Sequence, residues 1–146
     1  AVDKGVVDRI DAGAAVQVLH RFYAHLDDRR YADVVALMCA DVCWHRQGEA
    51  LRGHAAVMRA LERRPPNMMT LHVITNAFAM QAPPGEIALS ALMTAYRGSV
   101  EDAGALPVTI RGPFRASRLS VRFRREGTHW KIAEQDGVAT FEFANA

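Results

Sequence analysis

The sequence has few of the residues that mark specialised classes of protein. It contains only two cysteines among 146 residues, too few for a disulfide framework or a cysteine zinc site, and we expect Cys39 and Cys43 to be buried, reduced thiols. No apolar run approaches the roughly 20 residues of a membrane helix, so no membrane span is expected. Residues 1–13 carry acidic side chains where a signal peptide would be basic and then apolar, which favours a cytoplasmic protein.

An excess of charge of one sign is also absent, because 18 Lys and Arg residues oppose 16 Asp and Glu residues. Arg118, Arg122 and Arg124 form a basic stripe late in the chain. Aromatic side chains do not alternate with them, so we interpret the stripe as a sheet surface and expect no nucleic-acid partner. Half of the residues are hydrophobic, which is typical of one globular domain. We expect that domain to span residues 1–146, with residues 1–10 as an N-terminal extension.

The order of periodic segments predicts an α+β fold. Helical spacing of apolar residues covers 11–26, a shorter helix runs from Tyr31 to near Ala40, and a third follows Gly53 and ends before the prolines at 65–66. Strand patterns cover 41–46, 70–81, 86–99, about 109–125, and 129 to about 143. Their short connections predict a long antiparallel sheet of four or five strands. Pro113, inside the fourth of these segments, indicates a bulge or an edge position.

His72 is the histidine with the clearest chemical potential. On a strand it shares one face with Ile74, Asn76 and Phe78, and both faces are apolar enough that we expect both to be covered. Two interpretations stay open: a core histidine bonded to a backbone carbonyl, or an imidazole held by a carboxylate. A carboxylate fixes the imidazole tautomer and stabilises the imidazolium, which produces a general base or acid. The six histidines show no metal-ligand spacing, so no metal site is expected.

Short segments along nearly the whole chain, from about residue 10 to 140, resemble the SnoaL-like branch of the nuclear transport factor 2 superfamily. They are residues 22–27, 31–38, 40–44, 53–57, 72–76 and 127–132. The resemblance implies a cystatin-like cone: a curved antiparallel half-barrel closed by three N-terminal helices. Members of this superfamily include scytalone dehydratase, a hexachlorocyclohexane dehydrochlorinase, a bile-acid dehydratase, steroid isomerases and polyketide cyclases, together with many proteins that are not catalysts.

The resemblance also implies roles for individual residues. Asp27, and not Asp28, together with His72 matches the catalytic pair of the dehydratase-like members, and Ser117 matches a pocket serine. Four positions depart from scytalone dehydratase, which argues against scytalone as the substrate. Leu26 and Arg46 stand where that enzyme has tyrosines, Leu119 where it has an asparagine, and Tyr96 where it has a second histidine.

Strand and helix periods add the other expected pocket residues. The odd positions of 114–124 should face inward, so that Arg115 reaches the pocket mouth and holds an anion there, or else remains a surface arginine. Tyr23 lies one helical turn before Asp27 and either donates to a substrate oxygen or packs in the core. We expect Trp44 chiefly in the core. The complete set of expected pocket residues is Tyr23, Trp44, Arg46, Asn76, Tyr96, Arg115, Ser117 and Leu119.

Together these patterns predict a small lyase or isomerase, dehydratase-like or polyketide cyclase-like, that needs no cofactor and acts on a compact hydrophobic, cyclic ligand. The alternative is a non-catalytic module of the same fold that binds a small ligand or mediates oligomerisation. The resemblance implies a homodimer or homotrimer formed through the convex face of the sheet.

Overall fold

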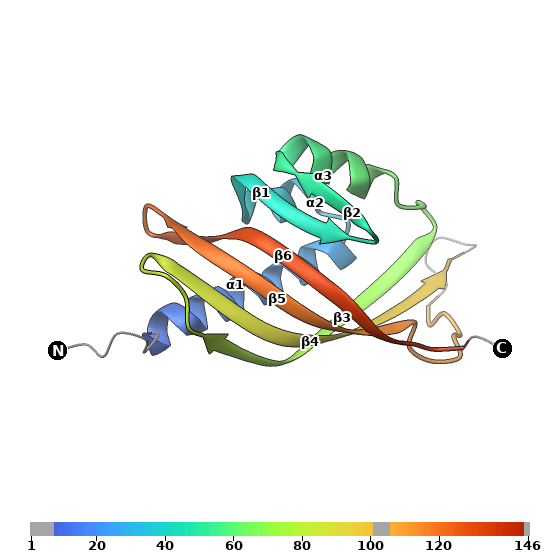
Figure 1. Cartoon of the computed structure of the whole chain (residues 1–146). Helices are drawn as coiled ribbons and strands as arrows, with labels where there is room; N and C mark the ends of the chain where they lie inside the picture. The colour runs from blue at the N-terminus through green and yellow to red at the C-terminus, as the bar shows by residue number, and fades with distance from the viewer. Residues whose placement is uncertain (1–7, 101–105, 145–146) are drawn as a thin grey trace.

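A computed structural model describes residues 8–100 and 106–144 of the chain. The helices are α1 (Arg9–Asp27), α2 (Tyr31–Ala36) and α3 (Gly53–Glu62). The strands are β1 (Met38–Arg46), β2 (Glu49–Arg52), β3 (Met68–Met80), β4 (Glu86–Ser99), β5 (Arg115–Glu126) and β6 (His129–Glu142) (Figure 1). Residues 1–7 of the expected N-terminal extension lie outside the described residues, and Arg9 and Ile10 already belong to α1.

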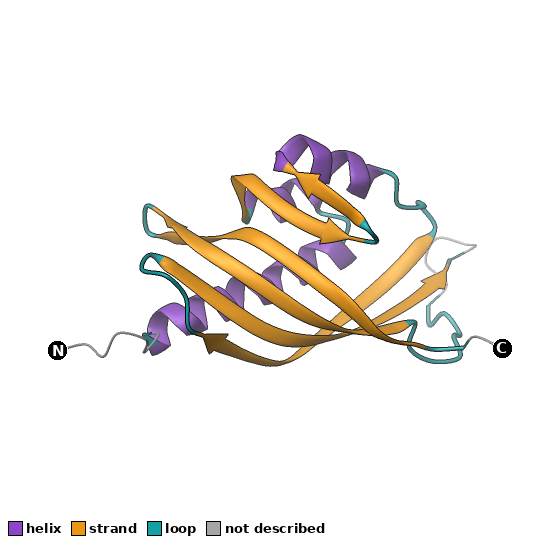
Figure 2. Cartoon of the chain, in the orientation of Figure 1, coloured by secondary structure: helices purple, strands orange, loops and turns teal. Residues whose placement is uncertain are grey.

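The strands form one curved sheet in the order β2-β1-β6-β5-β4-β3, with α1 against one face and the two shorter helices beside β1 and β2 (Figure 2). The predicted α+β class is therefore confirmed. The expectation of a wholly antiparallel sheet of four or five strands is wrong, because six strands are present and β1 pairs with β6 in parallel. The sheet does not close into a barrel, since β2 and β3 are its two edges.

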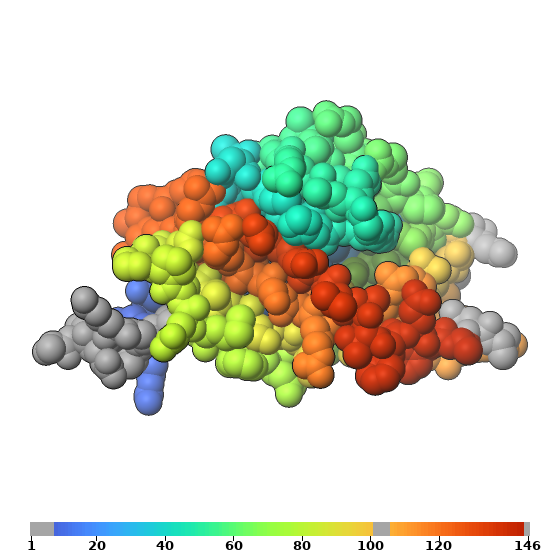
Figure 3. Space-filling model, in the orientation of Figure 1, coloured from blue at the N-terminus to red at the C-terminus, as the bar shows by residue number. Residues whose placement is uncertain are grey.

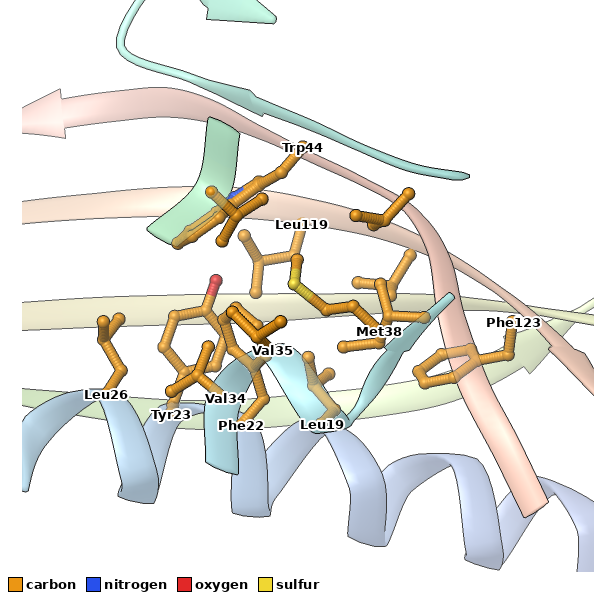
Figure 4. Close-up of a cluster of buried hydrophobic side chains, with 14 of the residues drawn as sticks. Leu19, Phe22, Tyr23, Leu26, Val34, Val35, Met38, Trp44, Leu119 and Phe123 are labelled. Atoms are coloured by element: carbon orange, nitrogen blue, oxygen red, sulfur yellow. The ribbon is translucent and has the colours of Figure 1, made fainter. Parts of the chain in front are cut away.

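The core lies between α1 and the inner face of the sheet, which is the face toward α1 (Figure 4). The apolar stripe of α1 is buried as its spacing predicts, and Phe22 and Leu19 have no exposed surface. The odd positions of β5 from Ser117 to Phe123 also face inward and are buried, as predicted. Cys39 and Cys43 are buried, unpaired thiols. No helix in the described part of the chain is long and apolar enough to cross a bilayer.

The connection from α2 into the sheet differs from the prediction. The second helix ends at Ala36 and not near Ala40, and β1 begins at Met38 and not at Asp41. The Leu37 carbonyl accepts a hydrogen bond from the Ile132 amide, and Met38 is the register partner of Ile132. Pairing with β6 therefore draws these apolar residues into the sheet, although their spacing also suits a helix.

Two further strand features were not predicted correctly. Gln47 and Gly48 both have positive φ and form a two-residue turn of the kind that joins twisted hairpin strands, so β2 follows β1 where only a turn was expected. Pro113 precedes β5, which begins at Arg115, so it causes no bulge inside that strand.

The outer face of the sheet, which lies away from α1, is not covered along β3. Leu71 is 64% exposed and Val73 is 45% exposed, so the expectation that both faces of this strand are covered is wrong for the single chain. Little of α1 is visible in Figure 3 because the strands lie in front of it in this view. The inner face therefore holds the core, and the outer face presents apolar side chains at the surface.

Candidate active site

The C-terminal end of α1 meets β3 at a carboxylate and an imidazole. Asp27, the last residue of α1, places Oδ1 2.6 Å from Nδ1 of His72. Asp27 Oδ2 accepts a hydrogen bond from the backbone N–H of His72 at 2.8 Å. The two side chains are only 10% and 13% exposed. The two carboxylate oxygens thus contact the backbone and the side chain of His72, which fixes the carboxylate beside the ring.

This arrangement selects one form of the imidazole. With a carboxylate at Nδ1, the Nδ1–H tautomer donates to Asp27 and leaves Nε2 with a lone pair. His72 contributes to the wall of a cavity, and no hydrogen-bond partner of Nε2 is found among the described residues. Within residues 8–100 and 106–144, the nitrogen that can exchange a proton with a ligand therefore has no hydrogen-bond partner.

Asp27 remains ionised although it is largely buried. Burial alone would raise the pKa of its carboxyl, but hydrogen bonds from the His72 side chain and backbone and from Thr70 outweigh burial, and the pKa lies below its ordinary value. The Asp27 carboxylate thus offers His72 a fixed negative charge.

Thr70 and Arg64, which the sequence did not single out, hold the Asp27 carboxylate in place through further hydrogen bonds. Thr70 Oγ1 donates to Asp27 Oδ1 at 2.8 Å and accepts from Arg64 Nη2 at 2.8 Å. Arg64 is 8% exposed, and its Nη1 donates to the Leu26 carbonyl at 2.9 Å. Thr70 shares a strand face with His72, so alternation could have identified it. No pattern singles out Arg64, because the path of the chain between α3 and β3 places it there.

Tyr23 extends the site toward the sheet. Its hydroxyl donates to Gln135 Oε1 at 2.7 Å, and its ring centroid lies 5.1 Å from that of His72. Figure 4 shows the hydroxyl pointing from α1 toward Trp44 and Leu119. Burial raises the pKa of Tyr23 far above its ordinary range, although nearby Arg46 opposes this effect, so the phenol stays protonated.

Gln135 is a further residue that the sequence analysis missed. It is fully buried on β6, and its Nε2 has no partner in the described part of the chain. Its position as a polar residue close to the apolar residues of β6 is the signal by which the sequence could have identified it. An amide can rotate by half a turn, in which case Nε2 would donate to the Tyr23 oxygen and the phenol proton would be free for a ligand.

His72, Tyr23, Thr70 and Arg64 border a cavity of about 150 Å³. The apolar part of its wall includes Leu26, Trp44, Met93 and Leu119. Seven of the eight expected pocket residues contribute to the wall: Tyr23, Trp44, Arg46, Tyr96, Arg115, Ser117 and Leu119. Tyr96 is the register partner of the exposed Leu71, so its side chain is on the outer face of the sheet, although the residue also borders the cavity.

Asn76 is the exception, and its assignment to the pocket is wrong. The β3–β4 register shifts between Thr75 and Phe78, and Asn76 has a positive φ of 54°. This bulge reverses the alternation, so Asn76 and Phe78 are exposed and Ala77 turns inward.

The arginines differ in their surroundings. Arg115 forms an ion pair with Glu142 at 2.7 Å. Arg46, half-buried at the end of β1, lies 5.1 Å from the ring centroid of Trp44. Burial and the neighbouring Arg64 lower the pKa of Arg46. Over residues 8–100 and 106–144, no group of histidine, cysteine, aspartate and glutamate side chains is arranged to hold a metal ion.

Comparison with known proteins agrees with this architecture. The family model for the SnoaL-like domain matches residues 9–136. A search of curated proteins gives no match. Among solved structures, a candidate scytalone dehydratase from Novosphingobium aromaticivorans is 15% identical with a TM-score of 0.76, covering 90% of this chain and 85% of that one.

Two other solved structures show the same fold. A hexachlorocyclohexane dehydrochlorinase, LinA type 2, is 16% identical with a TM-score of 0.74, covering 94% of this chain and 93% of its own. A protein of unknown function with a cystatin-like fold from Nostoc punctiforme is 13% identical with a TM-score of 0.74, covering 91% and 93%. At these identities the likeness concerns the fold.

Proposed function

This chain belongs to the SnoaL-like domain family, and from that premise we propose that it is a cofactor-independent lyase or isomerase in which His72 moves a proton on a compact, mainly hydrophobic cyclic substrate. The observation that carries the proposal is the 2.6 Å contact between Asp27 Oδ1 and His72 Nδ1, in a histidine that contributes to the wall of a cavity. Two of the structural neighbours bear the names of enzymes that eliminate water or hydrogen chloride.

The chemistry follows from the two nitrogens of the imidazole. Nε2 removes a proton from a carbon of the substrate, and the Asp27 carboxylate stabilises the imidazolium that forms. In an elimination the C–H electron pair becomes the new double bond and the leaving group departs with its own bonding pair. A departing hydroxide takes the proton back from Nε2 and leaves as water, whereas in an isomerisation the proton returns to a different carbon.

Oxygen-binding groups in the wall suit this chemistry. Arg46 contributes a positive charge to the wall, which favours a developing negative charge on the substrate. Tyr23 would donate to a developing enolate oxygen once the Gln135 amide has rotated. Ser117, which is 6% exposed, adds a hydroxyl on the opposite side, from β5.

The size of the cavity limits the substrate. Its volume of about 150 Å³ resembles that of an apolar protein cavity that accepts benzene. A single six-membered ring with small substituents therefore fits better than a fused-ring molecule.

One observation favours the alternative function, a domain that binds a ligand without turnover. The Tyr23 hydroxyl proton is held by Gln135, so this neutral donor, whose ring lies 5.1 Å from that of His72, is engaged. A binding domain would hold its ligand in the same cavity, and the hydrogen bond between Tyr23 and Gln135 would stay intact.

We also propose that the chain forms a homodimer or homotrimer through the outer face of its sheet. Register places Leu92, Arg118 and Val138 in one row across β4, β5 and β6, and Val138 is 61% exposed. Contact with a second copy would remove Leu92 and Val138, the two apolar members of this row, from water.

The catalytic test compares His72→Gln and Asp27→Asn with the wild type. Suitable probes are hexachlorocyclohexane, assayed by chloride release, and 3-hydroxycyclohexanone, assayed by the absorbance of the conjugated enone. Removal of the general base should lower kcat/KM by about 100-fold or more, and Asp27→Asn should lower it by at least about tenfold. His20→Gln is the matched control, because His20 is exposed on α1 and its loss should not change the rate.

A folded His72→Gln variant with wild-type turnover would contradict the catalytic role. If the wild-type protein turns over none of the probes but binds ring compounds in the cavity, the binding function is favoured.

A further inference from the structure

The charge on the cavity wall is of one sign. Arg46, Arg64, Arg97 and Arg115 all contribute to the wall, together with two histidines. In the described part of the chain no aspartate or glutamate joins them there, since Asp27 lies behind His72. Fixed cations in a concave, partly apolar site attract anions.

Two of these arginines are already engaged by the protein. Arg64 donates to the Leu26 carbonyl, the Tyr31 hydroxyl and Thr70. Arg115 donates to Glu142 at 2.7 Å. Their guanidinium groups therefore support the wall, and neither is the first choice for a ligand.

Arg46 and Arg97 differ in this respect. The guanidinium of Arg46 stacks near Trp44, and that of Arg97 lies 3.6 Å from the ring centroid of Phe114. No carboxylate within the described residues pairs with either of them. Arg46 is half-buried, and burial and the neighbouring Arg64 lower its pKa, although Tyr23 and Tyr31 oppose this effect. A desolvated guanidinium without a counter-ion is unfavourable, and an anionic ligand would supply the missing charge.

We propose that the ligand of this site is a ring compound that carries a carboxylate, which Arg46 binds at the cavity mouth while the ring lies against Trp44 and Leu119. A carboxylate matches the planar fork of a guanidinium with two parallel hydrogen bonds. Arg97, exposed at the same mouth, adds a second positive charge. This inference rests on the proposed function, since it names the substrate class of the same cavity.

The test uses two probes of nearly equal shape, benzoate and its neutral counterpart benzamide, titrated into the full chain by calorimetry at about pH 7. Benzoate should bind at least about tenfold more tightly, the ratio expected for one charge-assisted contact. The preference should fall as salt rises from about 50 to about 500 mM, while the affinity for benzamide stays constant.

Variants then assign the preference to a residue. Arg46→Gln should remove the preference for benzoate and leave benzamide binding unchanged, and Arg46→Lys should retain part of it. Arg9→Gln is the matched control, since Arg9 is exposed at the start of α1, outside the cavity wall, and should behave as the wild type. Circular dichroism and thermal melting check that each variant is folded.

Three results would overturn the inference: equal affinity for the two probes, no binding of either, or a benzoate preference that survives Arg46→Gln in a folded variant. His72→Gln should keep the preference, because binding of the anion does not need the base. A benzoate preference together with turnover that His72→Gln leaves unchanged would therefore leave this inference intact and refute only the catalytic proposal. Turnover of the neutral probes without a preference for benzoate would support the catalytic proposal and overturn this inference.

Discussion

Asp27 ends a helix at a position where the helix dipole disfavours an anion, and its hydrogen bonds compensate for this. The carboxylate accepts from the His72 ring, the His72 backbone and Thr70. These bonds lower the pKa of Asp27 despite burial. A carboxyl whose pKa is lower in the folded state than in the unfolded state stabilises the fold above its unfolded pKa.

Asp27→Asn should therefore change the acid dependence of stability. The extra stability of the wild type should be fully present above about pH 5 and should disappear as the pH falls from the unfolded pKa of about 3.9 through the lower folded pKa. Urea titrations of both proteins between about pH 2 and pH 7 measure this difference in the free energy of unfolding. A difference that does not vary with pH would show that the charge of Asp27 contributes nothing.

The sequence could identify only part of this site. Asp27 and His72 were predicted from the family resemblance, and Tyr23 from its helical position relative to Asp27. Arg64 and Gln135 were missed because their partners are distant along the chain: Arg64 bonds to Leu26, and Gln135 to a residue 112 positions away. Such pairings depend on tertiary packing, which the local residue period does not encode.

At the scale of elements, β3 shows what a single bulge does. Strand alternation predicted one continuous face through residues 72, 74, 76 and 78, but the positive φ of Asn76 and the register shift beside it exchange the two faces beyond that point. Asparagine is one of the few residues that adopt this backbone region easily. The bulge therefore has a local cause, although the sequence does not reveal which asparagine forms one.

Substitutions at Asn76 should separate the backbone effect from side-chain contacts. Asn76→Gly should stay within about 0.5 kcal/mol of the wild type, whereas Asn76→Val should lower the free energy of unfolding by about 1–2 kcal/mol, because a β-branched residue is strained at positive φ. Urea unfolding measures both. Thr75→Val, at the exposed neighbouring position, is the control and should be nearly neutral, and a fully stable Asn76→Val variant would contradict the argument.

Prediction succeeded best for elements with a strong local period. The strand 86–99 was predicted with the bounds that it has in the structure, and the buried stripe of α1 followed from its spacing. The parallel pairing of β1 with β6 could not be predicted, because it joins residues about 90 positions apart along the chain. Local alternation indicates a strand but not its partner or direction.

For the whole molecule, the sheet separates two apolar regions with different roles. The inner face encloses the core and the cavity, whereas the outer face leaves Leu71, Val138 and Phe141 between 61% and 65% exposed. Folding of a single chain explains the buried inner region but not the exposed outer one, since exposure of large apolar side chains to water is unfavourable. Contact between the outer faces of two or three copies would cover one region and leave the cavity accessible on the other side.

Sedimentation measurements should therefore give a dimer or trimer for the wild-type chain at tens of micromolar. Val138→Arg should shift it to a monomer, because a second cation beside Arg118 on the outer face would be buried in the assembly next to a charge of the same sign. Ile10→Arg provides the control: Ile10 is 82% exposed on α1, away from the sheet, so the same change there should leave the mass unchanged. A monomeric wild type, or a Val138→Arg variant that keeps its mass, would show that the outer face is not the contact. Since Val138 lies on the opposite face from His72, turnover measured on the monomeric variant would also reveal whether one copy suffices for the site.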